Sequence, residues 1–181
     1  MLPKPDRPIV GRDPFLGLIA QRLHDLHKGI SVQECVINVF GVPGIGKTSL
    51  LAYTAERFAD NGALVVAFEV DKVGADFRGA QLRFLQLFND ALHASGADSL
   101  PHKPVPHDAD EAALQAAAER LLADLLNQAQ PILLLLDAWD QAPEALFSWV
   151  ERILLLPLVR SERLLCVLAS QGALRWRQFE V

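Results

Sequence analysis

Residues 34–49 read E-C-V-I-N-V-F-G-V-P-G-I-G-K-T-S, and this stretch decides the fold class. Residues 34–40 form a short β-branched run that stops at a glycine, a pattern that predicts a buried strand. Glycines and a proline fill the next positions, and a helix is predicted to begin near Lys47 and to last to about Asp60. The sequence therefore predicts a strand, a glycine-rich turn and a helix in direct succession.

The turn itself, residues 41–48, fits the pattern G-x-x-x-x-G-K-[ST] of the Walker A loop. Glycines let main-chain N–H groups close around phosphate oxygens, and the N-terminus of the following helix favours negative charge. Lys47 is predicted to reach the β- and γ-phosphates, and the Thr48 hydroxyl to hold Mg²⁺. The predicted ligand is a polyphosphate. The alternative interpretation is a glycine-rich turn with a solvated lysine.

Three further apolar runs are predicted to be strands: residues 63–70, 131–137 and 163–170. The spacing of apolar residues predicts four more helices: about 14–28, 77–94, 108–128 with Asp108 as its N-cap, and 143–156, which Pro157 is expected to stop. Strands and helices alternate, and the strands are apolar throughout. We therefore expect an α/β fold, with a parallel sheet that helices cover on both faces.

The strand predicted at 131–137 ends in a carboxylate, Asp137. Ligands of α/β sheets bind at the carboxyl ends of the strands, and Mg²⁺ takes oxygen ligands. Asp137 is therefore predicted to bind the metal together with Thr48, as a Walker B residue; the alternative is an Asp that makes only local turn bonds. The next acid is Asp140, because Ala138 follows Asp137 directly. Asp140 is predicted either to orient an attacking water or to cap the next helix.

The composition limits the partners and the location of the protein. The chain has 181 residues, 51% of them hydrophobic, and a formal net charge of −5. An acidic chain lacks the positive surface that nucleic acids require. No apolar run approaches the roughly 18 residues that cross a bilayer, and the proline-rich start does not resemble a signal peptide. We expect a cytoplasmic protein whose domain binds neither membrane nor nucleic acid.

These elements together resemble the STAND class of P-loop NTPases, the signalling ATPases that include NB-ARC domains. The resemblance rests on G-V-P-G-I-G-K-T-S-L at 41–50, L-L-L-L-D-A-W-D at 133–140 and I-V-G-R-D at 9–13. It implies a three-layer fold of the ASCE type with strand order 5-1-4-3-2, the fifth strand being truncated or absent here. It also implies a single domain, with an N-terminal segment and helix at 1–30 and the P-loop core at 31–181.

The same resemblance implies a site for ATP or ADP with Mg²⁺. Adenine would pack against the segment that begins at Ile9, Asp140 would activate water, and Lys47 would be the second catalytic residue. Thr48 and Asp137 would hold the metal. The nucleotide-binding residues implied in this way are Val10, Gly11, Arg12, Pro43, Gly44, Ile45, Gly46, Lys47, Thr48, Ser49 and Ser170.

Two positions depart from the pattern of that class. Residues 169–171 read A-S-Q where members usually carry a Thr-Thr-Arg sensor, and Gln141 stands where a Glu is common. Ser170 can still hydrogen-bond a phosphate, but Gln171 brings no charge. We therefore expect an ATP-binding switch of a multidomain protein, with slow hydrolysis.

Two other functions stay open. An AAA+ motor or DNA-loading ATPase shares the loop and the acidic strand end, although Ala138 stands where such proteins place a Glu. A nucleotide-dependent interaction module without hydrolysis is the second. The helical lid and winged-helix region of the class would follow Val181. The expected partners are thus a lid, sensor or effector domains of a longer chain, and a second copy of the chain on activation.

Overall fold

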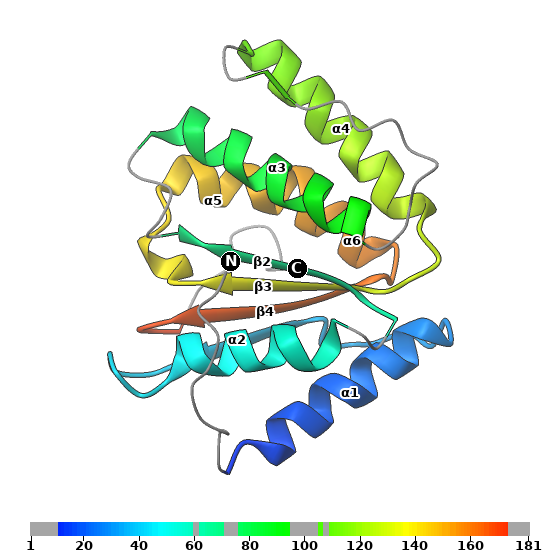
Figure 1. The fold of residues 1–181 in the computed structure, drawn as a ribbon, viewed down its shortest axis with the longest axis vertical. Coiled ribbons are helices and arrows are strands. Elements are labelled where there is room, and N and C mark those ends of the chain that lie inside the picture. Colours follow the sequence, from blue (N-terminus) through cyan, green and yellow to red (C-terminus); the bar gives the residue numbers. More distant parts are fainter. Residues whose placement is uncertain (1–10, 60–61, 71–75, 95–104, 107–108, 174–181) are drawn as a thin grey trace.

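The computed structural model describes residues 11–59, 62–70, 76–94, 105–106 and 109–173. Within these residues, four strands form one parallel sheet (Figure 1). They are β1 (Val36–Phe40), β2 (Leu64–Glu69), β3 (Ile132–Asp137) and β4 (Leu164–Ser170), in the spatial order β1-β4-β3-β2. This order confirms the predicted α/β fold and the 1-4-3-2 part of the predicted topology; no fifth strand lies in the described part of the chain.

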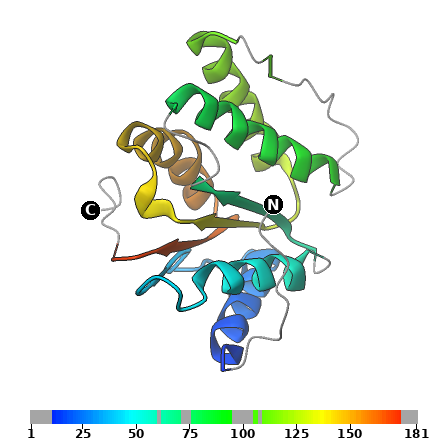
Figure 2. The same cartoon turned by 60° about the vertical axis from the view of Figure 1, so that its left-hand side comes forward.

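Helices cover both faces of the sheet (Figures 1 and 2). One face carries α1 (Asp13–His27) and α2 (Lys47–Phe58). The other carries α3 (Phe77–Ala94), α4 (Glu111–Asn127), α5 (Glu144–Val150), η3 (Glu151–Leu155) and α6 (Leu156–Arg160). A 3-10 turn, η2 (Trp139–Gln141), links β3 to α5. Because α2, α3 and η2 each follow a strand, their first residues gather at the carboxyl edge of the sheet.

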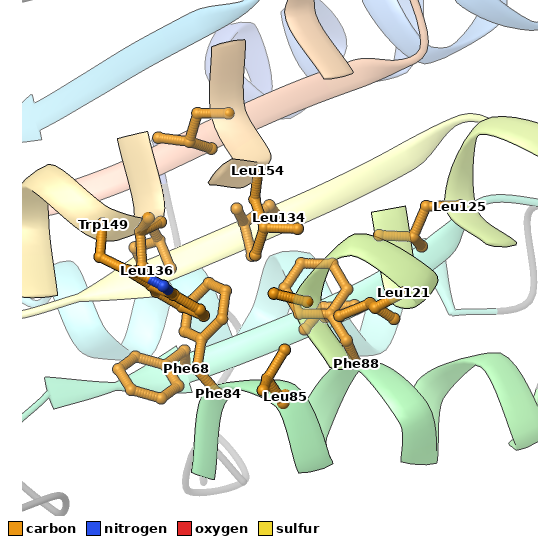
Figure 3. Close-up of a cluster of buried hydrophobic side chains, with 14 of the residues drawn as sticks. Phe68, Phe84, Leu85, Phe88, Leu121, Leu125, Leu134, Leu136, Trp149 and Leu154 are labelled. Atoms are coloured by element: carbon orange, nitrogen blue, oxygen red, sulfur yellow. The ribbon is translucent and has the colours of Figure 1, made fainter. Parts of the chain in front are cut away.

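The place of a strand in the sheet sets how deeply it is buried. Every residue of the central strands β3 and β4 is buried, whereas β1 has no fully buried residue and in β2 every second residue is partly exposed. The core under α3 is aromatic: the ring centroids of Phe68 and Phe84 lie 4.8 Å apart, and those of Phe84 and Phe88 lie 5.2 Å apart (Figure 3). Truncation of one such ring would cost about 3–5 kcal/mol. A well-packed sheet therefore fixes the carboxyl edge.

Two predicted helix boundaries are wrong. α4 is capped by Asp110, not Asp108: the side chain of Asp110 accepts a hydrogen bond from the Ala113 N–H at 2.8 Å. Pro157 does not stop the helix that opens after Pro143, since α5 runs through the π-helical η3 into α6. Pro157 follows directly on the π-helical turn of η3, and this wider turn accommodates a residue that has no N–H donor, so the chain stays helical.

Both cysteines are free thiols: Cys166 lies in β4, and Cys35 directly precedes the neighbouring strand β1. The Cys166 N–H donates to the Cys35 carbonyl at 2.7 Å, just before β1 pairs with β4. Burial raises the pKa of both thiols above the ordinary value, so both stay protonated and unreactive near neutral pH. In the described residues no helix combines the length and the apolar character that a bilayer span needs.

Candidate functional site

The glycine-rich loop after β1 is shaped by its main chain. Gly44 and Gly46 have φ of 82° and 92°, a left-handed conformation that side chains disfavour. Gly46 is the N-cap of α2 and offers no side-chain cap. The first N–H groups of α2 therefore lack an intrahelical partner and point out of the helix end. This arrangement forms an anion site at the carboxyl edge of the sheet.

The ammonium group of Lys47 is already held beside this loop. Its Nζ donates to the Gly41 carbonyl at 2.7 Å and to the Val42 carbonyl at 3.1 Å. The side chain thus folds back across the loop that precedes it, and its charge is held by the first two residues of that loop. A positive charge and main-chain donors on one concave turn favour a multiply charged anion.

The end of β3 places a buried carboxylate opposite the loop. Asp137 is 6% exposed, and its Oδ1 accepts a hydrogen bond from the Ala138 N–H at 3.0 Å. Within the described residues Asp137 makes no ion pair. Burial of a carboxylate without a cation is costly. The site therefore fits a cation that would join Asp137 when nucleotide binds.

A sharp turn brings the second acid back to the same place. Ala138 has φ 52° and ψ 36°, a left-handed conformation that is uncommon outside glycine. After it, η2 directs Asp140 towards the end of β4, where its Oδ2 accepts the Gln171 N–H at 3.0 Å. The alternative capping role of Asp140 is wrong, because the N-cap of α5 is Pro143 and no side chain caps that helix. Its role with water stays a prediction.

These parts line one cavity of about 350 Å³. Its lining comprises Pro43, Gly44, Gly46, Lys47, Thr48, Ser49, Asp137, Ala138, Asp140, Gln141, Ser170 and Gln171. The structure thus brings together most of the predicted loop residues, both predicted acids and Ser170. It does so from three strand ends, because β1, β4 and β3 are consecutive in the sheet.

Some predicted residues lie elsewhere. Ile45 does not line the cavity and is 52% exposed. Gly11 and Arg12 are exposed at the start of α1 and are also not part of its lining, while Val10 and Ile9 lie outside the described residues. Adenine packing by this segment therefore stays a prediction.

Three lining residues were not predicted as site residues: Ala138, Gln141 and Gln171. The signal that could have found them is adjacency, because each stands next to a predicted residue at a strand end or turn. Gln171 donates its main-chain N–H to Asp140. Any residue except proline could make this contact, so the residue type does not reveal it.

Thr48 and Asp137 are the described residues that fit Mg²⁺. Thr48 is half-buried in the first turn of α2, and both side chains line the cavity. A hydroxyl and a carboxylate oxygen suit this hard cation, which usually keeps waters and takes its other ligands from phosphates. In the described part of the chain, no group of three or more His, Cys, Asp or Glu side chains gathers as a metal cage.

Comparisons with known proteins give a family and a fold. Residues 8–168 match the family described as "AAA ATPase domain". No curated protein matches the chain. The chain is similar in fold to Cdc6p from Pyrobaculum aerophilum (TM-score 0.57, 17% identity over 95% of this chain) and to the ORC2 protein of Aeropyrum pernix in ADPNP–ADP complexes (TM-score 0.54, 19% identity over 94%). It is also similar to PCH-2 of C. elegans (TM-score 0.50, 16% identity over 92%).

The chain spans about two fifths of the length of those solved structures, namely 41%, 43% and 39%. The comparisons confirm the P-loop NTPase core that the sequence predicts. They match an AAA ATPase domain and do not confirm the STAND class, so the narrower resemblance to signalling ATPases stays a prediction.

Proposed function

The chain belongs to the AAA ATPase domain family, and from this premise we propose that it binds ATP with Mg²⁺, hydrolyses it slowly and acts as a nucleotide-dependent switch within a larger protein. The observation that carries the proposal is the single cavity in which Lys47, Asp137 and Asp140 meet the glycine-rich loop. A triphosphate needs main-chain donors, a cation and a metal carboxylate in one place, and these residues supply all three.

Binding is assigned to the loop and to Lys47. The N–H groups at the start of α2 would surround the phosphate oxygens, and the Lys47 ammonium would move from the Gly41 and Val42 carbonyls to the phosphates. Thr48 and Asp137 would hold Mg²⁺, which supplies charge neutralisation at the phosphates when it is bound. Pro43, Gly44, Gly46, Ser49 and Ser170 complete the lining on this side.

Hydrolysis is assigned to Asp140. Its carboxylate is exposed and reaches the cavity, where it can accept a proton from a water and orient that water. We propose slow turnover because Gln141 and Gln171, which also line the cavity, carry no charge that could stabilise the transferred phosphoryl group. Ala138 beside Asp137 offers no acid of its own, which disfavours a fast motor ATPase.

The switch is the coarsest part of the proposal. Nucleotide binding would change which groups hold Lys47 and Asp140. Lys47 contacts the residue that follows β1, and Asp140 contacts the residue that follows β4. Further parts of the protein, such as a lid, effector domains or a second copy of the chain, would respond to that change. We place this function in the cytoplasm, with no role for nucleic acid or membrane at this site.

A titration of ATP tests the binding step. With Mg²⁺ present, the full-length protein should bind ATP, and Lys47→Ala should weaken binding by about 100-fold or more while the thermal unfolding temperature stays close to that of the wild type. Lys28→Ala is the matched control, because Lys28 is exposed at the end of α1, away from the cavity. Equal affinity of the Lys47 variant and the wild type would refute the phosphate-loop assignment.

A measurement of phosphate release separates the switch from its alternative. An interaction module that binds nucleotide without hydrolysis is favoured by the uncharged Gln141 and Gln171. The proposed switch releases phosphate slowly and in a manner that depends on Asp140. Binding without any release over many hours would favour the interaction module.

A further inference from the structure

One peptide group connects the two sides of the cavity. The Ser170 carbonyl accepts a hydrogen bond from the Gly41 N–H at 3.3 Å, and Gly41 begins the glycine-rich loop. The Gln171 N–H, at the other end of the same peptide group, donates to Asp140 at 3.0 Å. A peptide group is planar, with its C=O and N–H on opposite sides. It therefore links the loop to Asp140 as a rigid spacer.

The side chain of Ser170 fixes this peptide group from one side. Its hydroxyl lies 2.9 Å from Oδ1 of Asn38 and 2.6 Å from the Gly172 carbonyl, and its one proton serves these two acceptors. Gly172 belongs to the same bend and moves with Ser170. Asn38 lies in β1, the strand that leads into the loop. Among the side-chain hydrogen bonds of the described residues, the bond to Asn38 therefore ties the end of β4 to a neighbouring strand.

Asn38 is itself out of place in its strand. It is the one polar residue of β1, V-I-N-V-F, and it is half-buried. Asparagine is depleted in strands, and a polar group away from water costs free energy unless it is hydrogen-bonded. In the register, Phe40 is paired with Ser170 and Asn38 with Leu168, so Asn38 and Ser170 lie on one face of neighbouring strands, two residues apart. The hydrogen bond to Ser170 therefore explains why a polar side chain is tolerated at position 38 of this strand.

We propose that Asn38 is a positioning residue for the nucleotide site. By anchoring Ser170 it orients the Ser170–Gln171 peptide group, and that group sets where Asp140 lies relative to the start of the loop. This inference rests on the proposed function for its catalytic consequence, whereas the effect on the Gln171 N–H follows from the contacts alone. Among the described residues, the Asn38 side chain hydrogen-bonds to one residue of the cavity lining, Ser170. It therefore acts on the site through Ser170.

Substitution of Asn38 tests the inference in the full-length protein. Asn38→Leu keeps the branched shape of the side chain and removes the acceptor. We expect kcat for ATP to fall about three- to tenfold, the factor that one neutral hydrogen bond is worth, while KM stays within about twofold. Asn38→Asp keeps an acceptor oxygen at the same position and should restore most of kcat. Asn89→Leu is the matched control, a half-buried asparagine on α3.

A second readout does not depend on catalysis. Hydrogen exchange of the Gln171 amide in the nucleotide-free protein reports the bond to Asp140 directly. We expect about three- to tenfold faster exchange in Asn38→Leu and exchange at the wild-type rate in Asn89→Leu. The Ser170→Ala variant removes the same bond from the other side, so Asn38→Leu should have little further effect on that background. If Asn38→Leu fails to fold, Ser170→Ala is held to the same exchange criterion.

The outcomes separate this inference from the proposed function. Wild-type exchange at Gln171 in Asn38→Leu, or an equal effect of this substitution with and without the Ser170 hydroxyl, overturns the positioning role. A wild-type protein that neither binds nor hydrolyses ATP overturns the proposed function instead. In that case, faster exchange at Gln171 in Asn38→Leu would still support the positioning of the peptide group.

Discussion

Two turns at the same edge of the sheet use opposite means to build the site. The turn after β1 relies on glycines, with Gly44 and Gly46 in the left-handed region, and presents mainly main-chain N–H groups. The turn after β3 has no glycine. It uses an alanine, Ala138, for its left-handed residue and presents two carboxylates, Asp137 and Asp140.

The two turns differ in how their stability depends on a bound ligand. A main-chain cradle binds an anion with no net charge of its own, so it tolerates both the filled and the empty state. Carboxylates on a strained turn are costly without a cation or a donor, and each is stabilised by one N–H here, from Ala138 and from Gln171. The first turn is suited to binding and the second to the response to what is bound.

The largest expected effect is on the second turn. Asp140→Asn removes the charge but keeps an oxygen that can accept the Gln171 N–H, so the turn should stay in place. We expect kcat for ATP to fall by about 100-fold or more, with ATP affinity little changed. Phosphate release and an ATP titration measure the two quantities. Asp90→Asn, at an exposed position of α3, is the control; equal turnover of the two variants would leave Asp140 with only its bond to Gln171.

The next substitution, at Asp137, should weaken ATP binding but stabilise the protein without nucleotide. Asp137→Asn should weaken binding of ATP in the presence of Mg²⁺ by about tenfold or more, because a carboxylate ligand is lost. In the absence of nucleotide the same change should raise the thermal unfolding temperature, because a buried charge without a cation is removed. Calorimetric titration and thermal unfolding measure these. A lower unfolding temperature without nucleotide would mean that Asp137 is stabilised by the protein alone.

A smaller effect tests the backbone of the first turn. Gly46→Ala adds a Cβ that meets no atom within 4 Å, so its cost is the left-handed strain alone, about 1–2 kcal/mol. Gly17→Ala is the control: Gly17 lies inside α1, its added Cβ also meets nothing within 4 Å, and a gain of about 0.5–1 kcal/mol is expected. Denaturant unfolding measures both free energies. Equal changes of the two variants would contradict the conformational role of Gly46.

The smallest effect tests the strain at Ala138. Ala138→Gly should stabilise the protein by about 0.5–1 kcal/mol, the left-handed strain of alanine less the entropy that glycine adds to the unfolded chain. Turnover should fall, because the turn that holds Asp140 becomes looser. Glu162→Gly is the control, since Glu162 also has a positive φ (56°) but lies in the turn before β4 at the opposite edge. It should gain stability with no loss of turnover, and a loss of the same size would show that the effect is not local to Asp140.

The fold could be predicted from sequence because its signals are local. The apolar run of β3 and its terminal Asp137 indicate a central strand with a charge at its end, and both hold in the structure. Two helix boundaries could not be predicted in this way, because each depends on the local backbone geometry that the helix adopts. The π-helical turn of η3 allows the helix to pass Pro157. Asp110 rather than Asp108 caps α4, although the sequence offers either aspartate as a cap.

By itself, the sequence determined the four strands, the order of elements and the glycine-rich loop, because these depend on residue type at short spacing: apolar runs, glycines with positive φ and a lysine at the start of a helix. The tertiary structure alone decided which groups meet across the strand ends. Asp140 accepts the Gln171 N–H and Ser170 reaches Asn38 because β1, β4 and β3 are neighbours in the sheet but far apart in the chain. Contacts of this kind depend on register and on main-chain direction, and neither is written in the identity of any single residue.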